Sequence, residues 1–204
     1  MPSIFVIKIP GWRTFVIEPP SFQRLLYVIG DFFHRESPLV SAIANDQDDL
    51  AVQLILRGAA ARNDGALSHA AMQGKILIVN ALLEAGKNPD EALKSKHNEG
   101  MSPLMWATNR RFHACMESLL AGGAKVNAQA KDGTTAVMCC MSHGVPDDLT
   151  GLEILCRYEP DITLKDWRGR NLIKEARDRE INSKNSAMRL LLERYYPEVD
   201  FTNP

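Results

Sequence analysis

The sequence predicts an all-α solenoid of about five helix-turn-helix units, with an N-terminal β-hairpin and helix as a cap. Two observations lead to this prediction. A pattern of Gly, Ser or Thr and two helical runs recurs, most clearly in "GMSPLMWATNRRFHACMESLLAGGAKVNAQAKDG" and "GTTAVMCCMSHGVPDDLTGLEILCRYEPDITLKDWRG". The spacing is 33 residues from Gly100 to Gly133 and 36 from Gly133 to Gly169. Such a period is typical of arrays whose units bury a continuous core by stacking.

Residues 1–36 match no repeat and form the first predicted domain. Ile4–Ile9 and Thr14–Ile17 are rich in β-branched and aromatic residues on either side of a Pro-Gly pair, which predicts a hairpin. Apolar residues with helical spacing follow in 22–33. We expect this segment to cover the open apolar face of the first unit. The alternative is a dimerising element, because an exposed hairpin edge recruits other strands.

The repeat array is predicted over residues 37–196, followed by a tail over 197–204. The units begin at Ser37, Gly65, Gly100, Gly133 and Gly169. Each unit has an apolar anchor early in its first helix: Leu39, Leu67, Leu104, Val137 and Ile173. Because no unit can bury its apolar face alone, stability should come from stacking.

Local signals predict where the helices of each unit begin and end. Ser37, Ser102 and Thr135 are predicted N-caps of first helices, and glycines after the second helices predict left-handed stops. These glycines are Gly58, Gly86 and Gly123. Small residues should allow neighbouring first helices to approach closely: Ala42, Ala70, Ala71, Ala107 and Cys140. The second helices should supply the core between units: Leu82, Leu83, Leu119, Leu120, Ile154, Leu155, Leu190 and Leu191.

On these motifs the chain resembles the ankyrin repeat family. "GMSPLMWAT" is similar to the first half of the family pattern, and "SLLAGGAKVNAQAKDG" and "HAAMQGKILIVNALLEAG" are similar to its second half. The family's His after the anchor is replaced in every unit, by Val40, Ser68, Met105, Met138 and Lys174. The resemblance therefore implies turns that are less stiff than in consensus repeats.

The resemblance also implies a concave surface made of turn tips and the exposed sides of the first helices. Carried over by position, the candidate partner-binding residues are Trp106, Asn109, Arg110, Lys131, Asp132, His143, Trp167, Arg168, Arg170 and Arg179. Trp and Arg are the residue types most enriched at interface hot spots. Trp167 lies in the polar turn "LKDWRGRN", where its ring either packs locally or awaits a partner.

Composition excludes several classes of function. The chain has 24 basic and 25 acidic residues, so no overall field draws it toward nucleic acid or anionic lipid. The basic residues of the C-terminal third are interleaved with acidic ones, which also argues against a nucleic-acid partner. No apolar run reaches membrane-spanning length, and the N-terminus lacks the features of a secretory signal. We therefore expect no membrane association and a cytoplasmic location, or a host cytoplasm for a delivered effector.

The four cysteines, Cys115, Cys139, Cys140 and Cys156, have no C-x-x-C spacing and are expected to be reduced core thiols. Cys139, Cys140 and His143 form a C-C-x-x-H cluster. Zinc needs four converging ligands, and a nucleophilic Cys–His pair needs an orienting acid and an oxyanion pocket. The sequence provides neither set, so we predict no metal, no cofactor and no enzymatic activity.

The leading functional prediction is a non-enzymatic module that binds a protein partner through the concave face and inhibits or sequesters it. An immunity protein and an effector both fit this description, and an acidic patch on the partner would suit the candidate residues. One alternative is a structural subunit that oligomerises through the N-terminal hairpin, so the chain is expected to be a monomer or such a dimer. The other alternative is a Cys/His-dependent enzyme.

Overall fold

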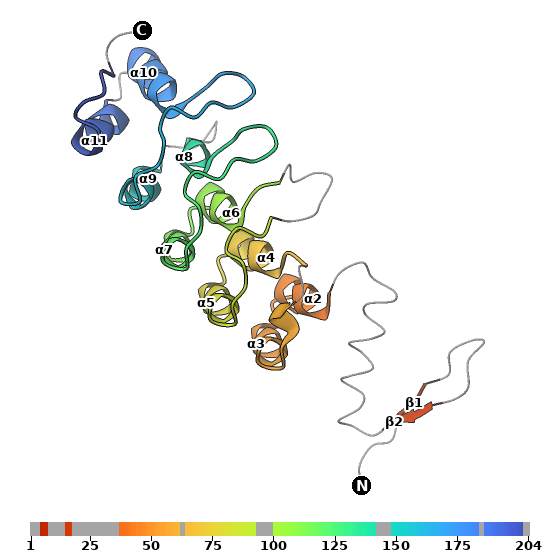
Figure 1. Ribbon diagram of the computed structural model, residues 1–204. Coiled ribbons are helices and arrows are strands. Elements are labelled where there is room, and N and C mark those ends of the chain that lie inside the picture. Colours follow the sequence, from red (N-terminus) through yellow and green to blue (C-terminus); the bar gives the residue numbers. More distant parts are fainter. Residues whose placement is uncertain are drawn as a thin grey trace.

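The computed structural model describes residues 5–7, 15–17, 37–61, 64–92, 100–141, 148–183 and 186–201. From residue 37 onward these residues form two layers of helices (Figure 1). The inner layer holds α2 (Pro38–Ala44), α4 (Ala66–Gln73), α6 (Pro103–Asn109), α8 (Ala136–Cys139) and α10 (Leu172–Ser183). The outer layer holds α3 (Asp48–Leu56), α5 (Ile76–Glu84), α7 (His113–Ala121), α9 (Leu149–Cys156) and α11 (Ala187–Tyr195). A short 3-10 helix, η1 (Ala59–Ala61), follows α3. The all-helical repeat fold is confirmed.

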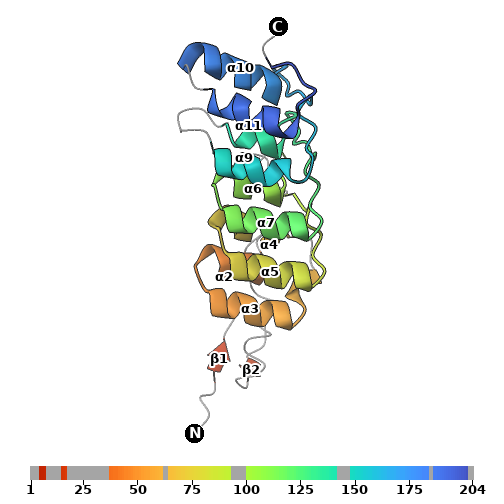
Figure 2. The same cartoon turned by 90° about the vertical axis from the view of Figure 1, so that its left-hand side faces the viewer.

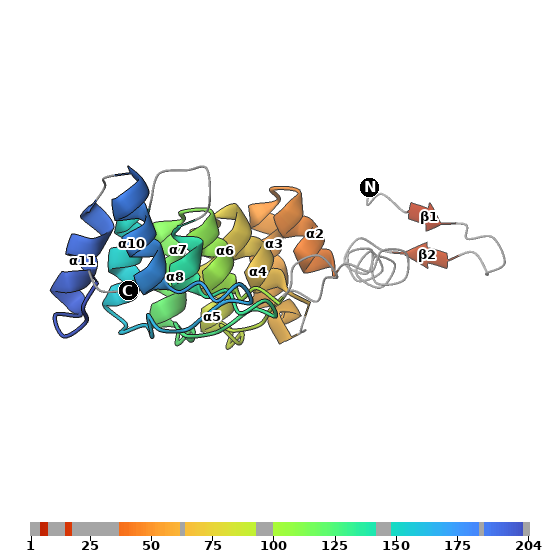
Figure 3. The ribbon, with the colours of Figure 1, turned by 90° about the horizontal axis from the view of Figure 1, so that it is seen from above.

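The units stack in chain order. Figure 2 shows the outer helices one above another along the long axis. Figure 3 shows that the loops joining one unit to the next lie along one edge of the stack. In Figure 1 these loops project beyond the inner helices. The inner helices and the projecting loops lie on the same side of the stack, where the family resemblance places a concave surface.

The helix boundaries follow mostly from the local signals. The backbone N–H of Val40 donates to Ser37 Oγ at 3.2 Å, and that of Met105 donates to Ser102 Oγ at 3.3 Å, so both caps are confirmed. Thr135 also precedes its helix, but the prediction that its side chain caps α8 is wrong. The Thr135 hydroxyl is buried and has no hydrogen-bond partner among the residues that the structure describes. Glycines with φ of 80 to 88° follow α3, α5 and α7, as predicted.

One core runs through the array from α2 to the residues after α11. The predicted small residues of the inner helices are all buried, and so are most of the predicted outer-helix leucines. Leu83 and Leu191 are only partly buried, although both pack against the core, and Leu190 is mostly exposed. Met188 and Leu192 are four residues apart on the buried face of α11, which leaves Leu190 on the opposite face of the helix.

The core extends past the predicted boundary at residue 196. Phe201 is among the largest fully buried side chains, although it lies in the segment predicted to be a tail. The hydroxyl of Tyr196 donates to the carbonyl oxygen of Pro160 at 2.7 Å. The residues after α11 therefore pack against the last units and help to close the stack.

Near the N-terminus, β1 (Phe5–Ile7) and β2 (Phe15–Ile17) pair antiparallel, with Phe5 opposite Ile17. The helix expected at 22–33 lies outside the described residues. The role of residues 1–36 as a cap over the first unit stays a prediction.

Candidate partner-binding surface on the loop tips and inner helices

Two neighbouring loops, 130–134 and 166–170, have the same turn geometry and are joined to each other. In the first, Ala130 N–H donates to the Thr134 carbonyl at 2.9 Å, and in the second Asp166 N–H donates to the Arg170 carbonyl at 3.0 Å. Across the two loops, Trp167 N–H donates to the Asp132 carbonyl at 2.8 Å. The backbone that carries Trp167 is therefore held by the preceding unit.

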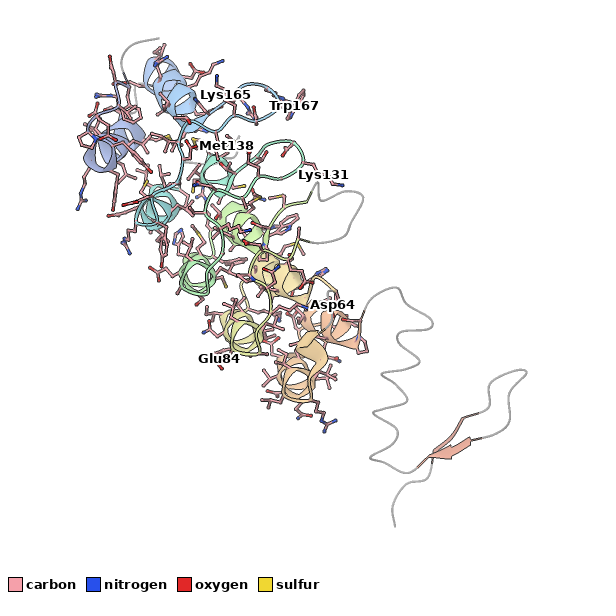
Figure 4. All side chains as sticks on the ribbon, viewed as in Figure 1. Asp64, Glu84, Lys131, Met138, Lys165 and Trp167 are labelled. Atoms are coloured by element: carbon pink, nitrogen blue, oxygen red, sulfur yellow. The ribbon has the colours of Figure 1, made fainter. Side chains whose placement is uncertain are left out.

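The Trp167 side chain lies at the tip of its loop, and Lys131 lies at the tip of the loop before it (Figure 4). The ring is 69% exposed, and the Arg168 guanidinium carbon lies 4.6 Å from the ring centroid. This cation–π contact orients both side chains in solvent. Most of the ring is thus available to a second molecule rather than packed into the array.

Arg170 has a different position from Arg168, although the sequence groups them. The Arg170 Nε atom donates to Asp166 Oδ2 at 2.8 Å, and its Nη2 atom lies 2.7 Å from the same oxygen. Asp166 Oδ1 also accepts the backbone N–H groups of Arg168 and Arg170, both at 2.9 Å. Arg170 is therefore an internal partner of a buried carboxylate that shapes the loop.

Opposing effects act on the ionisation of Asp166. Burial alone would raise the pKa of this carboxyl, but hydrogen bonds from the backbone and side chain of Arg170 and from the backbone of Arg168 outweigh it. The charge of Arg170 acts in the same direction, so the pKa lies below its ordinary value.

Replacing Asp166 with Asn should lower the free energy of unfolding by about 2 kcal/mol at pH 7, because the half-buried Arg170 guanidinium and two backbone N–H groups lose a buried carboxylate as their partner. Since the folded-state pKa of Asp166 is lowered, its contribution is complete above the unfolded-state value of about 3.9 and disappears as pH falls through the folded-state value. Urea unfolding at pH 7 and pH 3 measures the difference between wild type and D166N, which should shrink at pH 3. The exposed Glu84→Gln on α5 is the control. An equal D166N effect at both pH values would contradict this assignment.

The remaining candidate residues are divided between exposed and internal positions. Lys131, Asn109 and Arg110 are exposed. Trp106 is half-buried, and its buried Nε1 atom has no hydrogen-bond partner within the described part of the chain. Both Asp132 carboxylate oxygens accept hydrogen bonds from Thr134, at 2.9 and 2.7 Å. Arg179 Nη2 donates to the Met141 carbonyl at 2.8 Å, which joins α10 to the end of α8. His143 lies outside the described residues.

Sequence reasoning missed a buried polar cluster at the start of α4. Lys87 Nζ lies 3.2 Å from Asp64 Oδ1 and 3.1 Å from Glu91 Oε2. Glu91 also accepts the N–H of Gly65, at 2.8 Å, and Asp64 accepts that of Ala66, at 3.1 Å. Gly65 is at the cap position of α4 and has no side chain, so the two carboxylates satisfy the helix N-terminus. Because Gly65 has no side chain to cap α4, the sequence did indicate that other polar groups must satisfy this helix N-terminus.

A second polar contact was also missed. His113 Nε2, at the start of α7, lies 2.9 Å from both carboxylate oxygens of Asp148. Asp148 also caps α9 by accepting the Gly151 N–H at 3.0 Å. The contact joins the outer helices of two successive units, which are 35 residues apart in sequence. No local pattern in the sequence predicts such a pair.

All four cysteines are reduced and buried. Burial raises the pKa of Cys115 to about 11 and that of Cys156 to about 12. Burial, and then the charge of Asp132, raises the pKa of Cys139 to about 12, and burial raises that of Cys140 well above its ordinary value. The thiols are therefore protonated at neutral pH, whereas a nucleophile or metal ligand must be a thiolate. Within the described ranges, no group of three His, Cys, Asp or Glu side chains is placed to hold a metal ion.

The architecture defines the class of the protein. A stack of helix-turn-helix units with joined loop tips is a helical repeat solenoid that presents an extended inner surface. A family model described as ankyrin repeats, in three copies, matches residues 67–166. Residues 67–166 therefore belong to the ankyrin repeat family. In the part of the chain that the structure describes, no helix has the length and apolar character of a membrane span.

Two curated proteins are similar to this chain. An ankyrin repeat-containing protein of Treponema pallidum is 32% identical over 109 residues, which cover 50% of this chain and 35% of the relative. An ankyrin repeat domain-containing protein of Stachybotrys chartarum is 29% identical over 104 residues, which cover 51% of this chain and 5% of the relative. The chain therefore spans only a minor part of the relatives that it matches.

Proposed function

We propose that this chain binds a protein partner through its concave face, without catalysing a reaction, and that binding inhibits or sequesters the partner. Ankyrin repeats are generally protein–protein interaction modules, and the family is typically non-enzymatic. The observation that carries the proposal is Trp167, which is 69% exposed while its backbone is held by the neighbouring loop. A rigid exposed aromatic side chain can bury apolar area in a complex at low entropic cost.

The charges around Trp167 favour an acidic partner surface. Lys131, Lys165 and Arg168 are exposed, and together with Trp167 we call them the tip cluster. The nearest carboxylates on these loops, Asp132 and Asp166, already accept hydrogen bonds within the loops. The tip cluster thus presents three cations around one aromatic ring. Such surfaces accelerate encounter with acidic partners and select against basic ones.

The four cysteines bear on where the protein acts. Four reduced, buried thiols support a cytoplasmic location, because reducing compartments keep thiols free. Their raised pKa values also support a role that does not use cysteine chemistry. A binding protein that acts only by occupying a partner would serve as an immunity protein or as an effector, and we propose this general mode of action for the chain.

The test compares two pairs of substitutions at adjacent Arg and aromatic positions. Trp167→Ala with Arg168→Glu removes the centre of the tip cluster and keeps the Asp166–Arg170 pair. Arg157→Glu with Tyr158→Ala alters another exposed pair, just after outer helix α9, and serves as the control. A partner captured by the wild-type chain is identified and purified, and its Kd for each variant is measured by calorimetry.

The first variant should weaken the measured Kd by about 30-fold or more, since one hot spot contributes about 2 kcal/mol. The control variant should bind like the wild type. If the Kd of the Trp167→Ala/Arg168→Glu chain stays unchanged, the proposed surface is wrong.

A further inference from the structure

A small pocket lies in the inner layer beside the tip cluster. Its volume is about 30 Å³, and its lining, as far as the structure describes it, consists of Met138, Met141, Asp166, Arg170 and Glu175. The pocket lies beside the shortest described inner helix, because α8 spans only Ala136–Cys139 while α10 spans Leu172–Ser183. A cavity needs about 10–15 Å³ for each water-sized group, so this one has room for roughly two such groups.

The polar groups of the pocket are paired with one another. Asp166 is bound by Arg170, as described above. Glu175 Oε1 lies 3.8 Å from Arg170 Nη1, and Glu175 Oε2 lies 3.8 Å from Arg179 Nε. These two carboxylates and two guanidinium groups balance in charge. A charged group in the pocket would therefore gain little binding free energy, whereas an apolar group can gain it from contact with the lining.

Two methionines supply that apolar contact. Met138 is half-buried on α8, and Met141 is buried just after the helix. Methionine side chains are flexible and polarizable, so they adapt to the shape of an inserted aliphatic group. The small volume of the pocket suits the end of a Leu, Ile or Met side chain better than an aromatic ring or a nucleobase.

The pocket and the tip cluster are parts of one surface. Asp166 lines the pocket, and its chain neighbours Lys165 and Trp167 belong to the tip cluster. Figure 4 shows Met138 on α8 and Trp167 on the loop that projects past this helix. A single short segment of a partner can therefore contact both.

The geometry points to one kind of partner segment: an acidic stretch whose carboxylates contact Lys131, Lys165 and Arg168, and whose single aliphatic side chain enters the pocket. This inference rests on the proposed function and adds the chemistry of the partner to it. A basic segment is opposed by the three cations of the tip cluster. A nucleic acid would satisfy those cations but has no flexible aliphatic side chain to place in the pocket.

Methyl NMR of the full chain with ¹³C-labelled methionine tests the inference directly. The probes are the peptides acetyl-DELED-amide, acetyl-DESED-amide and acetyl-KKLKK-amide, and an oligo(dT) strand. Single substitutions Met138→Leu and Met141→Leu assign the two resonances, and Met72 on α4 is the internal control. DELED should shift the Met138 and Met141 methyl signals to saturation and leave Met72 in place. DELED should bind about tenfold more tightly than DESED, because it buries about two additional CH₂-sized groups.

Two variants separate the pocket from the charges. Met138→Phe fills the pocket and should abolish the preference for DELED over DESED, while both peptides still bind. Lys131→Glu should weaken both peptides and preserve the preference. Circular dichroism and the unchanged Met72 signal show whether each variant keeps its fold.

Three results would overturn the inference. If DELED and DESED bind with equal affinity and the two methionine signals do not move, no aliphatic side chain enters the pocket. That result would leave the proposal of an acidic partner on the tip cluster unchanged. If KKLKK binds as tightly as DELED or more tightly, the inference that the partner segment is acidic is wrong. Tighter binding of oligo(dT) that shifts the same methionine signals would assign the surface to nucleic acid instead. Failure of the proposed function itself has a separate readout, the unchanged Kd of the Trp167→Ala/Arg168→Glu chain.

Discussion

Substituting Gly133 with alanine is expected to lower the free energy of unfolding by about 3 kcal/mol, combining a left-handed backbone penalty with overpacking. Gly133 has a φ of +80°, which disfavours any side chain. An added Cβ would also lie 2.8 Å from the Lys165 carbonyl oxygen and 2.9 Å from the Asp166 Cα atom. These are backbone atoms that cannot rotate away, so the loop carrying Trp167 must move.

Gly169 provides a matched control, because it has the same place in the next loop and a φ of +72°. A Cβ built there meets no atom of the described structure within 4 Å. Gly169→Ala should therefore cost only about 1 kcal/mol, the conformational part of the penalty. Urea unfolding measures both effects, and hydrogen exchange of the Trp167 amide should accelerate in G133A alone. Equal destabilisation by the two substitutions would show that the contact between the loops contributes nothing.

Lys87→Met is expected to cost about 3–5 kcal/mol, because removing one partner of a buried ion pair leaves an uncompensated charge. The side chains of Asp64, Lys87 and Glu91 are at most 11% exposed. Without the ammonium group, two carboxylates remain close together at the start of α4. The attraction of the helix N-terminus for negative charge offsets only part of this repulsion. Urea unfolding at pH 7 measures the loss.

Lys75→Met is the matched control for Lys87→Met. Lys75 Nζ also contacts two carboxylates, Asp46 at 2.7 Å and Asp48 at 2.6 Å, but both are exposed to solvent. Its removal should cost less than about 1 kcal/mol. The triple variant Lys87→Met/Asp64→Asn/Glu91→Gln should recover part of the stability, because it removes the unpaired charges. A K87M loss no greater than that of K75M would contradict a buried network.

The repeat period and the local helix signals were sufficient to predict the fold. Ser102 caps α6 as expected, and the glycines after the outer helices have left-handed backbones, because these features depend on a few neighbouring residues. The anchors Leu39, Leu67, Leu104 and Val137 are buried for the same reason, since helical spacing decides which face a residue occupies. Ile173 is only half-buried. The errors at Leu190 and Thr135 come from applying the pattern of one unit to others with different neighbours.

The candidate surface could be predicted only in part. The position of Trp167 and Arg168 at a loop tip follows from the repeat register, and their exposure agrees with it. The sequence could not separate Arg168 from Arg170, since both are arginines of one polar turn. Arg170 is bound to Asp166 because the loop closes and brings its guanidinium to a buried carboxylate.

The sequence by itself determined the family, the order of the helices and most of the buried apolar positions, because these depend on short-range spacing and on a repeated period. The tertiary structure alone decided which polar groups meet. Asp64 contacts Lys87, His113 contacts Asp148, and Met138 lines a pocket with Glu175, across 23 to 37 residues of sequence. Electrostatic and hydrogen-bond energies depend on distances of a few ångströms, and only the stacking of successive units sets those distances.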